Sequence, residues 1–314
     1  MPRGMETGVL TVAAVRKPTG AKITKVLFHE REQIFTLPSR SSTARALARQ
    51  LRAALDKKVP IKATLDPRRG LVRRIDAPTE RELRKFERLR ISLEKPQKTV
   101  RVNVKTIDPI TFNIVGRYLK FPIFKLCKKV IPTYKTAKKI FDYCAKQSCH
   151  LPGPPNITPC IPFQYVIDGC YARAHKMRKI IEEKYGYCCE KVFSFATQNN
   201  DDLAVQANKW GGCCVFWWYH VAPLVRVRIK IFGIKLELAL VIDPSMFDKP
   251  VLLSTWLAAQ ENTACASNAK VSIYSIQPGS AYWPTNFAGT TFGTDPNYVS
   301  TDATCIAYKN LTTC

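Results

Sequence analysis

Apolar residues recur at helical and at strand spacing along this chain, and the two spacings predict a mixed α and β protein. In residues 41–58, Leu47, Leu51 and Leu55 share one face, which predicts an amphipathic helix. Residues 79–93 are predicted as a second helix, because Thr79 and Glu82 have the spacing of a capping box. Short apolar runs predict strands at 26–28, 34–35, 61–65 and 70–75, whereas residues 1–22 are predicted as a loose terminus.

The second half of the chain has its own set of predicted elements. Residues 133–147 and 171–185 have helical character, and four apolar residues place one face of the latter helix against a core: Ala174, Met177, Ile180 and Ile181. Strands are predicted at 187–195 and at 213–222, the latter buried on both faces. Alternation predicts a hairpin over 225–232 and 235–242, and residues 163–167 are predicted as a strand or extended arm.

Charge and cysteine content change abruptly between these two halves. Residues 1–126 hold 29 Lys and Arg against 11 Asp and Glu, whereas residues 127–314 hold 20 against 13. All 12 cysteines lie between Cys127 and Cys314. We therefore expect a small, basic α+β domain at residues 1–117, a linker at 118–126 and a larger domain at 127–314. Prolines and basic residues between positions 95 and 125 also make this stretch a natural target for a protease.

The cysteines indicate an oxidising compartment and a disulfide framework whose pairing the sequence leaves open. Zinc is disfavoured, because residues 188–189 and 213–214 are vicinal pairs, no C-x-x-C occurs and the chain has only 4 histidines. We expect no metal and no other cofactor, since a phosphate-binding glycine loop is also lacking. No signal peptide and no membrane-length apolar run are visible. We nevertheless expect a secreted protein, not a membrane protein, with any leader removed or of a non-standard kind.

The first segment has an excess of Lys and Arg, as nucleic-acid-binding proteins do. Its arginines, however, are spread over both predicted helices and the loops, without interleaved aromatic residues or a known reader motif. A solvated surface that complements an acidic partner accounts for the same pattern. We therefore do not expect a nucleic-acid partner.

Three residues could form the triad of a cysteine hydrolase: Cys170, His220 and Asp243. Asp168 and Gly169 supply turn or cap chemistry, so Cys170 begins a helix, where the macrodipole and free amides lower a thiol pKa. His220 lies in an apolar strand and Asp243 ends the next strand but one, the order found in papain-like and transglutaminase-like enzymes. Each residue also has a purely structural interpretation. Cys170 could be half of a disulfide, His220 a buried core residue, and Asp243 a turn former before a proline.

Three blocks of sequence surround these residues: 161–178 with Asp168-Gly169-Cys170, 213–222 with His220, and 241–247 with Asp243. In their order and spacing the blocks closely resemble bacterial protein-glutaminases, also called protein deamidases. The resemblance extends weakly to residues 130–132, 147–149 and 262–265. The first segment resembles the pro-region of that family, through the helix around Leu51 and through residues 59–61 and 77–80.

The resemblance implies a papain/transglutaminase-like α+β catalytic domain preceded by a small α+β pro-domain. It implies hydrolysis of protein-bound glutamine to glutamate and ammonia, with Cys170 as nucleophile, His220 as acid and base, and Asp243 orienting the imidazole. It also implies a secreted, inactive precursor whose own pro-region covers the site until a processing protease removes it. Proteins and peptides with accessible glutamine would be the substrates, and we expect a monomer. As a further hypothesis, residues 31–34 lie across the cleft and mimic substrate.

Two other functions remain open at this point. A transglutaminase would form the same thioester but transfer the acyl group to an amine. A basic, non-enzymatic binding protein would use Cys170 only as a structural residue, for example in a disulfide.

Overall fold

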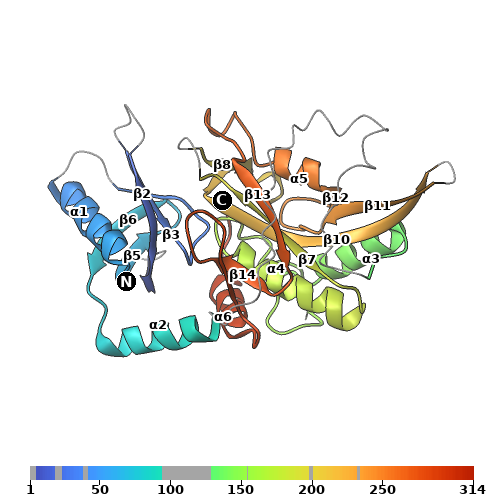
Figure 1. Cartoon of the computed structure of the whole chain (residues 1–314), viewed down its shortest axis with the longest axis horizontal. Helices are drawn as coiled ribbons and strands as arrows, with labels where there is room; N and C mark the ends of the chain where they lie inside the picture. Colours follow the sequence, from blue (N-terminus) through green and yellow to red (C-terminus); the bar gives the residue numbers. More distant parts are fainter. Residues whose placement is uncertain are drawn as a thin grey trace.

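The computed structural model consists of two units that lie side by side, a smaller N-terminal unit and a larger C-terminal unit (Figure 1). It describes residues 5–17, 23–37, 42–93, 129–153, 155–197, 201–231 and 234–314. The expected domain boundary at residue 117 and the expected linker at 118–126 lie outside the described residues. Both units contain helices and sheets, so the predicted α+β class is confirmed.

The first unit is a six-stranded sheet with one helix packed against it. Its strands, in spatial order, are β1 (Glu6–Leu10), β5 (Ile61–Asp66), β6 (Leu71–Asp76), β4 (Phe35–Leu37), β3 (Thr24–Phe28) and β2 (Val12–Arg16). The prediction of a loose terminus is wrong for residues 6–16, because Leu10 and Val12 are buried in the apolar core of this unit. Two five-residue strands separated only by Thr11 are too short to show a clear alternating pattern.

Both helices predicted for the first unit are confirmed. Helix α1 (Ser42–Lys57) buries Leu47 and Leu51 in the core beneath the sheet. Helix α2 (Glu80–Leu93) begins with the predicted capping box: the Thr79 hydroxyl accepts the N–H of Glu82 (3.3 Å), and the Glu82 carboxylate accepts the N–H of Thr79 (2.8 Å). Helix α2 extends from the first unit towards the second, where it contacts β15 (Phe292–Thr294) (Figure 1).

The second unit is built on a five-stranded antiparallel sheet. In spatial order its strands are β12 (Val251–Leu252), β11 (Ile234–Val241), β10 (Tyr219–Ile231), β7 (Glu190–Phe195) and β13 (Ile273–Pro278). Helix α4 (Cys170–Lys179) packs against β10 and also against α6 (Val299–Tyr308). Every residue of α4 from Cys170 to Met177 is therefore buried, whereas the sequence pattern predicted only one buried face.

The remaining elements of the second unit surround this sheet. They are α3 (Tyr134–Ala145), the π-helical turn η2 (Ile180–Lys184) that continues α4, β8 (Leu203–Gln206), the 3-10 turn η3 (Asn208–Trp210), β9 (Cys214–Trp217), α5 (Leu253–Ala258), β14 (Ala281–Pro284) and β15. Between described residues, disulfides join Cys149 to Cys160, Cys213 to Cys314 and Cys214 to Cys265. The predicted disulfide framework is thus present, and none of the described helices combines the length and apolar character needed to cross a membrane.

Two strand predictions in the second unit are wrong. Residues 213–222 do not form one strand: β9 ends at Trp217, and β10 begins at Tyr219 and continues past Pro223 to Ile231. Consequently β11 pairs directly with the strand that carries His220, and Asp243 follows the next strand, not the next but one. Residues 163–167 form buried turns, in which Val166 bonds through its N–H to the Thr313 hydroxyl instead of to a neighbouring strand.

An apolar cluster and several polar contacts join the two units. Ala13, Leu27 and Ile34 of the first unit share one core cluster with Tyr171 and Trp218 of the second. Around it, Lys25 forms an ion pair with Asp202, and Arg16 donates to the carbonyl oxygen of Ala196 (2.7 Å). The basic first unit therefore complements acidic residues of the second.

Candidate active site

Cys170 is the first residue of α4, and the turn before it accounts for its position. Gly169 has φ +88°, and a Cβ atom there would lie 2.9 Å from the Tyr308 ring, so both backbone conformation and packing require glycine. Of the two residues predicted to supply turn or cap chemistry, Gly169 is the N-cap of α4, whereas the Asp168 carboxylate binds the first unit. Cys170 is buried and forms no disulfide, so its interpretation as half of a disulfide is excluded.

His220 and Asp243 meet beside this helix. His220 Nε2 lies 3.0 Å from Asp243 Oδ2, because β10 and β11 are paired and Asp243 follows β11. Trp256 Nε1 donates to the same carboxylate oxygen (2.9 Å), and the Ser245 hydroxyl donates to the other. The imidazole is stacked between Trp256 and the ring of Trp217, whose centroid lies 4.3 Å away. The ring of His220 is thus fixed by a charge on one edge and by aromatic faces on both sides.

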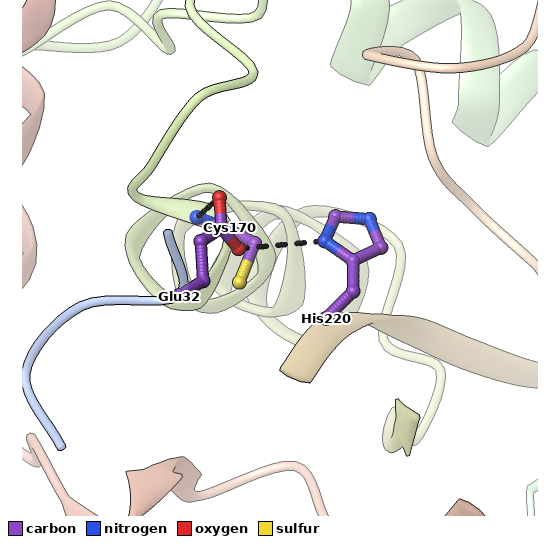
Figure 2. Close-up of side chains that lie close together, drawn as sticks. All are labelled: Glu32, Cys170 and His220. Carbon is purple, nitrogen blue, oxygen red and sulfur yellow. Dashed lines mark hydrogen bonds and ion pairs between the residues drawn. The ribbon is translucent and has the colours of Figure 1, made fainter. Parts of the chain in front are cut away.

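Glu32 of the first unit reaches into this centre, where its carboxylate lies beside Cys170 and faces His220 (Figure 2). Its Oε1 accepts the backbone N–H of Cys170 (3.2 Å), and its Oε2 lies 3.4 Å from His220 Nδ1. The Cys170 sulfur, a His220 nitrogen and a Glu32 oxygen all lie within 4.8 Å of one another. The predicted position of residues 31–34, across the site, is confirmed. That they mimic substrate stays a prediction.

A buried network holds Glu32 in place. The Glu32 N–H donates to Asp168 Oδ1 (3.0 Å), and Arg31 donates to Asp168 Oδ2 (2.6 Å). Arg173 contacts Glu32 Oε1 (3.3 Å) and donates to the carbonyl oxygens of Tyr165 and Asp168. The negative charge of Glu32 in a water-poor site is therefore balanced by a guanidinium.

The electrostatics of the covered centre keep the thiol protonated. Burial, and then the Glu32 carboxylate, raise the pKa of Cys170 well above its ordinary value. The expected lowering of this pKa at a helix start is thus reversed while Glu32 is present. For His220, burial lowers the pKa, but hydrogen bonds to Asp243 and Glu32 outweigh burial and raise it. Burial alone would raise the pKa of Asp243, but the bond to His220 and two further donors hold it at about 2.

Among the described residues, one group of side chains could hold a metal ion, and it is Glu32, Cys170 and His220. Each of these residues already has a polar contact within the chain, and Arg173 contributes a positive charge beside the carboxylate.

Sequence reasoning brought together Cys170, His220 and the 31–34 segment but missed two supporting residues. Trp256, which donates to Asp243, lies in a short helix with no chemical motif around it. Arg173 lies one turn after Cys170 and is buried, because α4 is buried on all sides, whereas the sequence pattern predicted only one buried face. Both act by orienting charged groups of the centre.

Comparisons with known proteins identify the same family for different parts of the chain. A family model described as Glutaminase matches residues 137–260. Comparison with curated proteins finds no match. A crystal structure of pro-protein-glutaminase has 27% sequence identity and a TM-score of 0.69, covering 99% of this chain and 95% of that chain. A crystal structure of protein-glutaminase has 35% identity and a TM-score of 0.51, covering 59% of this chain and 92% of that chain.

An NMR structure of protein-glutaminase from Chryseobacterium proteolyticum gives a similar result, with 35% identity, a TM-score of 0.50, and coverage of 59% of this chain and 91% of that chain. The likeness to the pro-protein form spans nearly the whole chain, whereas the likeness to the enzyme form spans a smaller part of it. This chain therefore belongs to the protein-glutaminase family, as a protein-glutamine glutaminase in the precursor form with its pro-region in the same chain.

Proposed function

We propose that Cys170, His220 and Asp243 are the catalytic triad with which this protein deamidates glutamine side chains of proteins and peptides. His220 takes the proton of the Cys170 thiol as the sulfur attacks the carboxamide carbon, and the backbone N–H of Cys170 stabilises the oxyanion. His220 passes this proton to the leaving nitrogen, the C–N bond breaks, and ammonia departs from a thioester. His220 then takes a proton from water, whose oxygen attacks the thioester. The S–C bond breaks, glutamate is formed, and the proton on His220 returns to the Cys170 thiolate. Asp243 holds the imidazole in orientation throughout.

The position of Glu32 is the observation that carries this proposal. Glutamate is the product of the reaction and has the shape of glutamine. The carboxylate of Glu32 lies where the scheme requires the reacting group: one oxygen accepts the N–H of Cys170, and the other lies beside His220. The hydrogen bond between His220 and Asp243 has the length that the orienting role requires.

The covering of this centre supports an inhibitory role for the pro-region. Glu32 and Cys170 are both almost fully buried, so no protein substrate reaches the thiol while the first unit stays in place. We assign the pro-region to residues 1–117, the processing region to 118–126 and the enzyme to 127–314. Disulfides in the second unit agree with secretion, since such bonds persist in oxidising compartments.

The test is ammonia release from a protein substrate before and after proteolytic cleavage between residues 94 and 128. We expect activity only after cleavage, and none in Cys170→Ser. Cys144→Ser is the matched control, because Cys144 is also buried and unpaired but lies in the core around α3. Equal activity before and after cleavage would exclude the inhibitory role, and full activity in Cys170→Ser would exclude the triad. Incorporation of a labelled amine in place of ammonia release would indicate a transglutaminase.

A further inference from the structure

The main chain of the segment around Glu32 is hydrogen-bonded to the enzyme. The Trp218 N–H donates to the carbonyl oxygen of Glu32 (3.0 Å), and the indole Nε1 of Trp218 donates to that of Arg31 (2.6 Å). Ile34 donates its N–H to the carbonyl oxygen of Phe216 (3.2 Å). These bonds would form with any extended peptide in the same place, because they use only the main chain of the bound segment.

Besides Glu32, the side chain of Arg31 in the bound segment has a charged partner that belongs to the enzyme. Arg31 donates to Asp168 Oδ2 (2.6 Å), and Asp168 is 1% exposed. The Tyr308 hydroxyl donates to the same oxygen (2.7 Å), and the Tyr308 ring lies beside the guanidinium. The other ion pair of Arg31 is with Glu6, which belongs to the first unit and leaves with it. Asp168 and Tyr308 stay with the enzyme.

We propose that Asp168 and Tyr308 form a subsite that selects Arg or Lys immediately before the glutamine to be deamidated. The proposal rests on the proposed function, since it takes the position of Glu32 as that of the target residue. One oxygen of Asp168 would accept the backbone N–H of the target glutamine, as it accepts that of Glu32. The other would accept a hydrogen bond from the basic side chain that precedes the glutamine, as it does from Arg31. The preferred substrates are thus glutamines in extended segments with a basic residue directly before them.

Charge pairing in this place accounts for the selectivity. Removal of the pro-region takes Arg31 away and leaves the Asp168 carboxylate with a neutral hydroxyl and no cation from that segment. A guanidinium or ammonium group at the same position restores the charged hydrogen bond, a neutral side chain of equal shape does not, and a carboxylate meets a like charge.

The test is the rate of ammonia release from five peptides by the protease-activated protein, measured above neutral pH. In the covered precursor, burial raises the pKa of Asp168 to about 7, so a pH above neutral keeps this carboxylate ionised when a peptide covers it again. The peptides differ only in the residue before glutamine, which is Arg, citrulline, Lys, norleucine or Glu. We expect kcat/KM to be roughly tenfold higher for Arg than for citrulline and for Lys than for norleucine, and lowest for Glu. Citrulline and norleucine match the shapes of the basic residues without their charge.

Variants separate the charge from other roles of the site. Asp168→Asn should bring the Arg/citrulline ratio close to one, whatever happens to the absolute rate, because only the ratio reports the charge. Tyr308→Phe removes a hydroxyl but keeps the carboxylate, so its ratio should stay high. Equal kcat/KM for all five peptides, or an unchanged ratio in folded Asp168→Asn, would overturn the subsite. Failure of the activated protein to release ammonia from any peptide would overturn the proposed function, and the subsite with it.

Discussion

The carboxylate of Glu32 lies 3.4 Å from Nδ1 of His220, on the ring edge opposite the one that faces Asp243. The imidazole is therefore held between two carboxylates, one from each unit of the chain. One of them, Asp243, is part of the enzyme, and the other occupies the place of a reaction product. The precursor thus resembles an enzyme–product complex in which the product is part of the same polypeptide.

Glu32→Gln should convert the pro-region into a substrate of its own enzyme. The introduced glutamine would present a carboxamide to Cys170 in the position now held by the carboxylate. We expect about one equivalent of ammonia per chain, with residue 32 recovered either as glutamate or as a thioester to Cys170, depending on access of water. Ammonia assay and peptide mass mapping measure both products.

The control for this experiment is Glu32→Gln combined with Cys170→Ser, in which the introduced glutamine should remain intact. Gln33 provides an internal control in the same chain, because its amide nitrogen donates to the Pro67 carbonyl oxygen (2.6 Å) within the first unit and does not face the thiol. An unmodified glutamine at position 32 in the chain that keeps Cys170 would contradict the placement of the nucleophile.

The proposed triad could be predicted from the sequence because few residues of the right chemistry occur in suitable elements. Only one of the 4 histidines lies in a strongly apolar strand, and only one cysteine follows an Asp-Gly turn into a helix. The contact between Glu32 and Cys170 joins residues 138 positions apart, and no local pattern encodes which side chain of the 31–34 segment enters the centre. The continuity of β10 could not be predicted, because Pro223 lies inside this strand at a position where its missing N–H does not end the pairing.

Binding of the cleaved pro-region to the enzyme should weaken as the pH rises. The pKa values of Cys170 and His220 are both raised in the covered centre, in each case with a contribution from Glu32. The enzyme with bound pro-region (the covered state) therefore holds protons that the enzyme without it (the open state) releases. This stabilisation is complete below the pKa values of the open state and is lost as the pH rises through those of the covered state. Inhibition of ammonia release by added pro-region, measured across pH, gives the affinity.

Two variants distinguish this effect from a general loss of affinity. Burial also raises the pKa of Cys170, and Asp243 also raises that of His220, but Glu32→Ala removes the contribution of Glu32 to both, so the affinity of this variant should depend less on pH. Lys25→Ala removes the ion pair with Asp202, outside the centre, so its affinity should fall by a similar factor at every pH. The linkage would be refuted by an affinity that increases with pH in the unmodified protein.

Replacement of Asp243 should separate its charge from its orienting role. Asp243→Ala removes the acceptor for His220 Nε2 and Trp256 Nε1, and we expect kcat to fall by roughly 10²-fold or more with little change in KM. In Asp243→Asn, the amide oxygen can still accept both donors while the amide nitrogen donates to the Ser245 hydroxyl. Asp243→Asn should therefore keep much of the activity that Asp243→Ala loses. Its His220 pKa should be lower than in the unmodified protein, because the negative charge of Asp243 is lost. Steady-state kinetics across pH measure both effects, and equal losses in Ala and Asn would argue against an orienting role.

Substitution of Gly169 should destabilise the protein through the turn that delivers Cys170. Gly169→Ala places a methyl group 2.9 Å from the Tyr308 ring in a residue with φ +88°, and we expect a loss of about 2–4 kcal/mol in the free energy of unfolding. Gly212→Ala is the matched control, because Gly212 also has positive φ (+81°) but no atom within 4 Å of the added group. Its loss should be about 1 kcal/mol, the contribution of backbone strain alone. Denaturant unfolding of both variants measures the difference, and equal losses would show that packing against Tyr308 does not determine the position of the nucleophile.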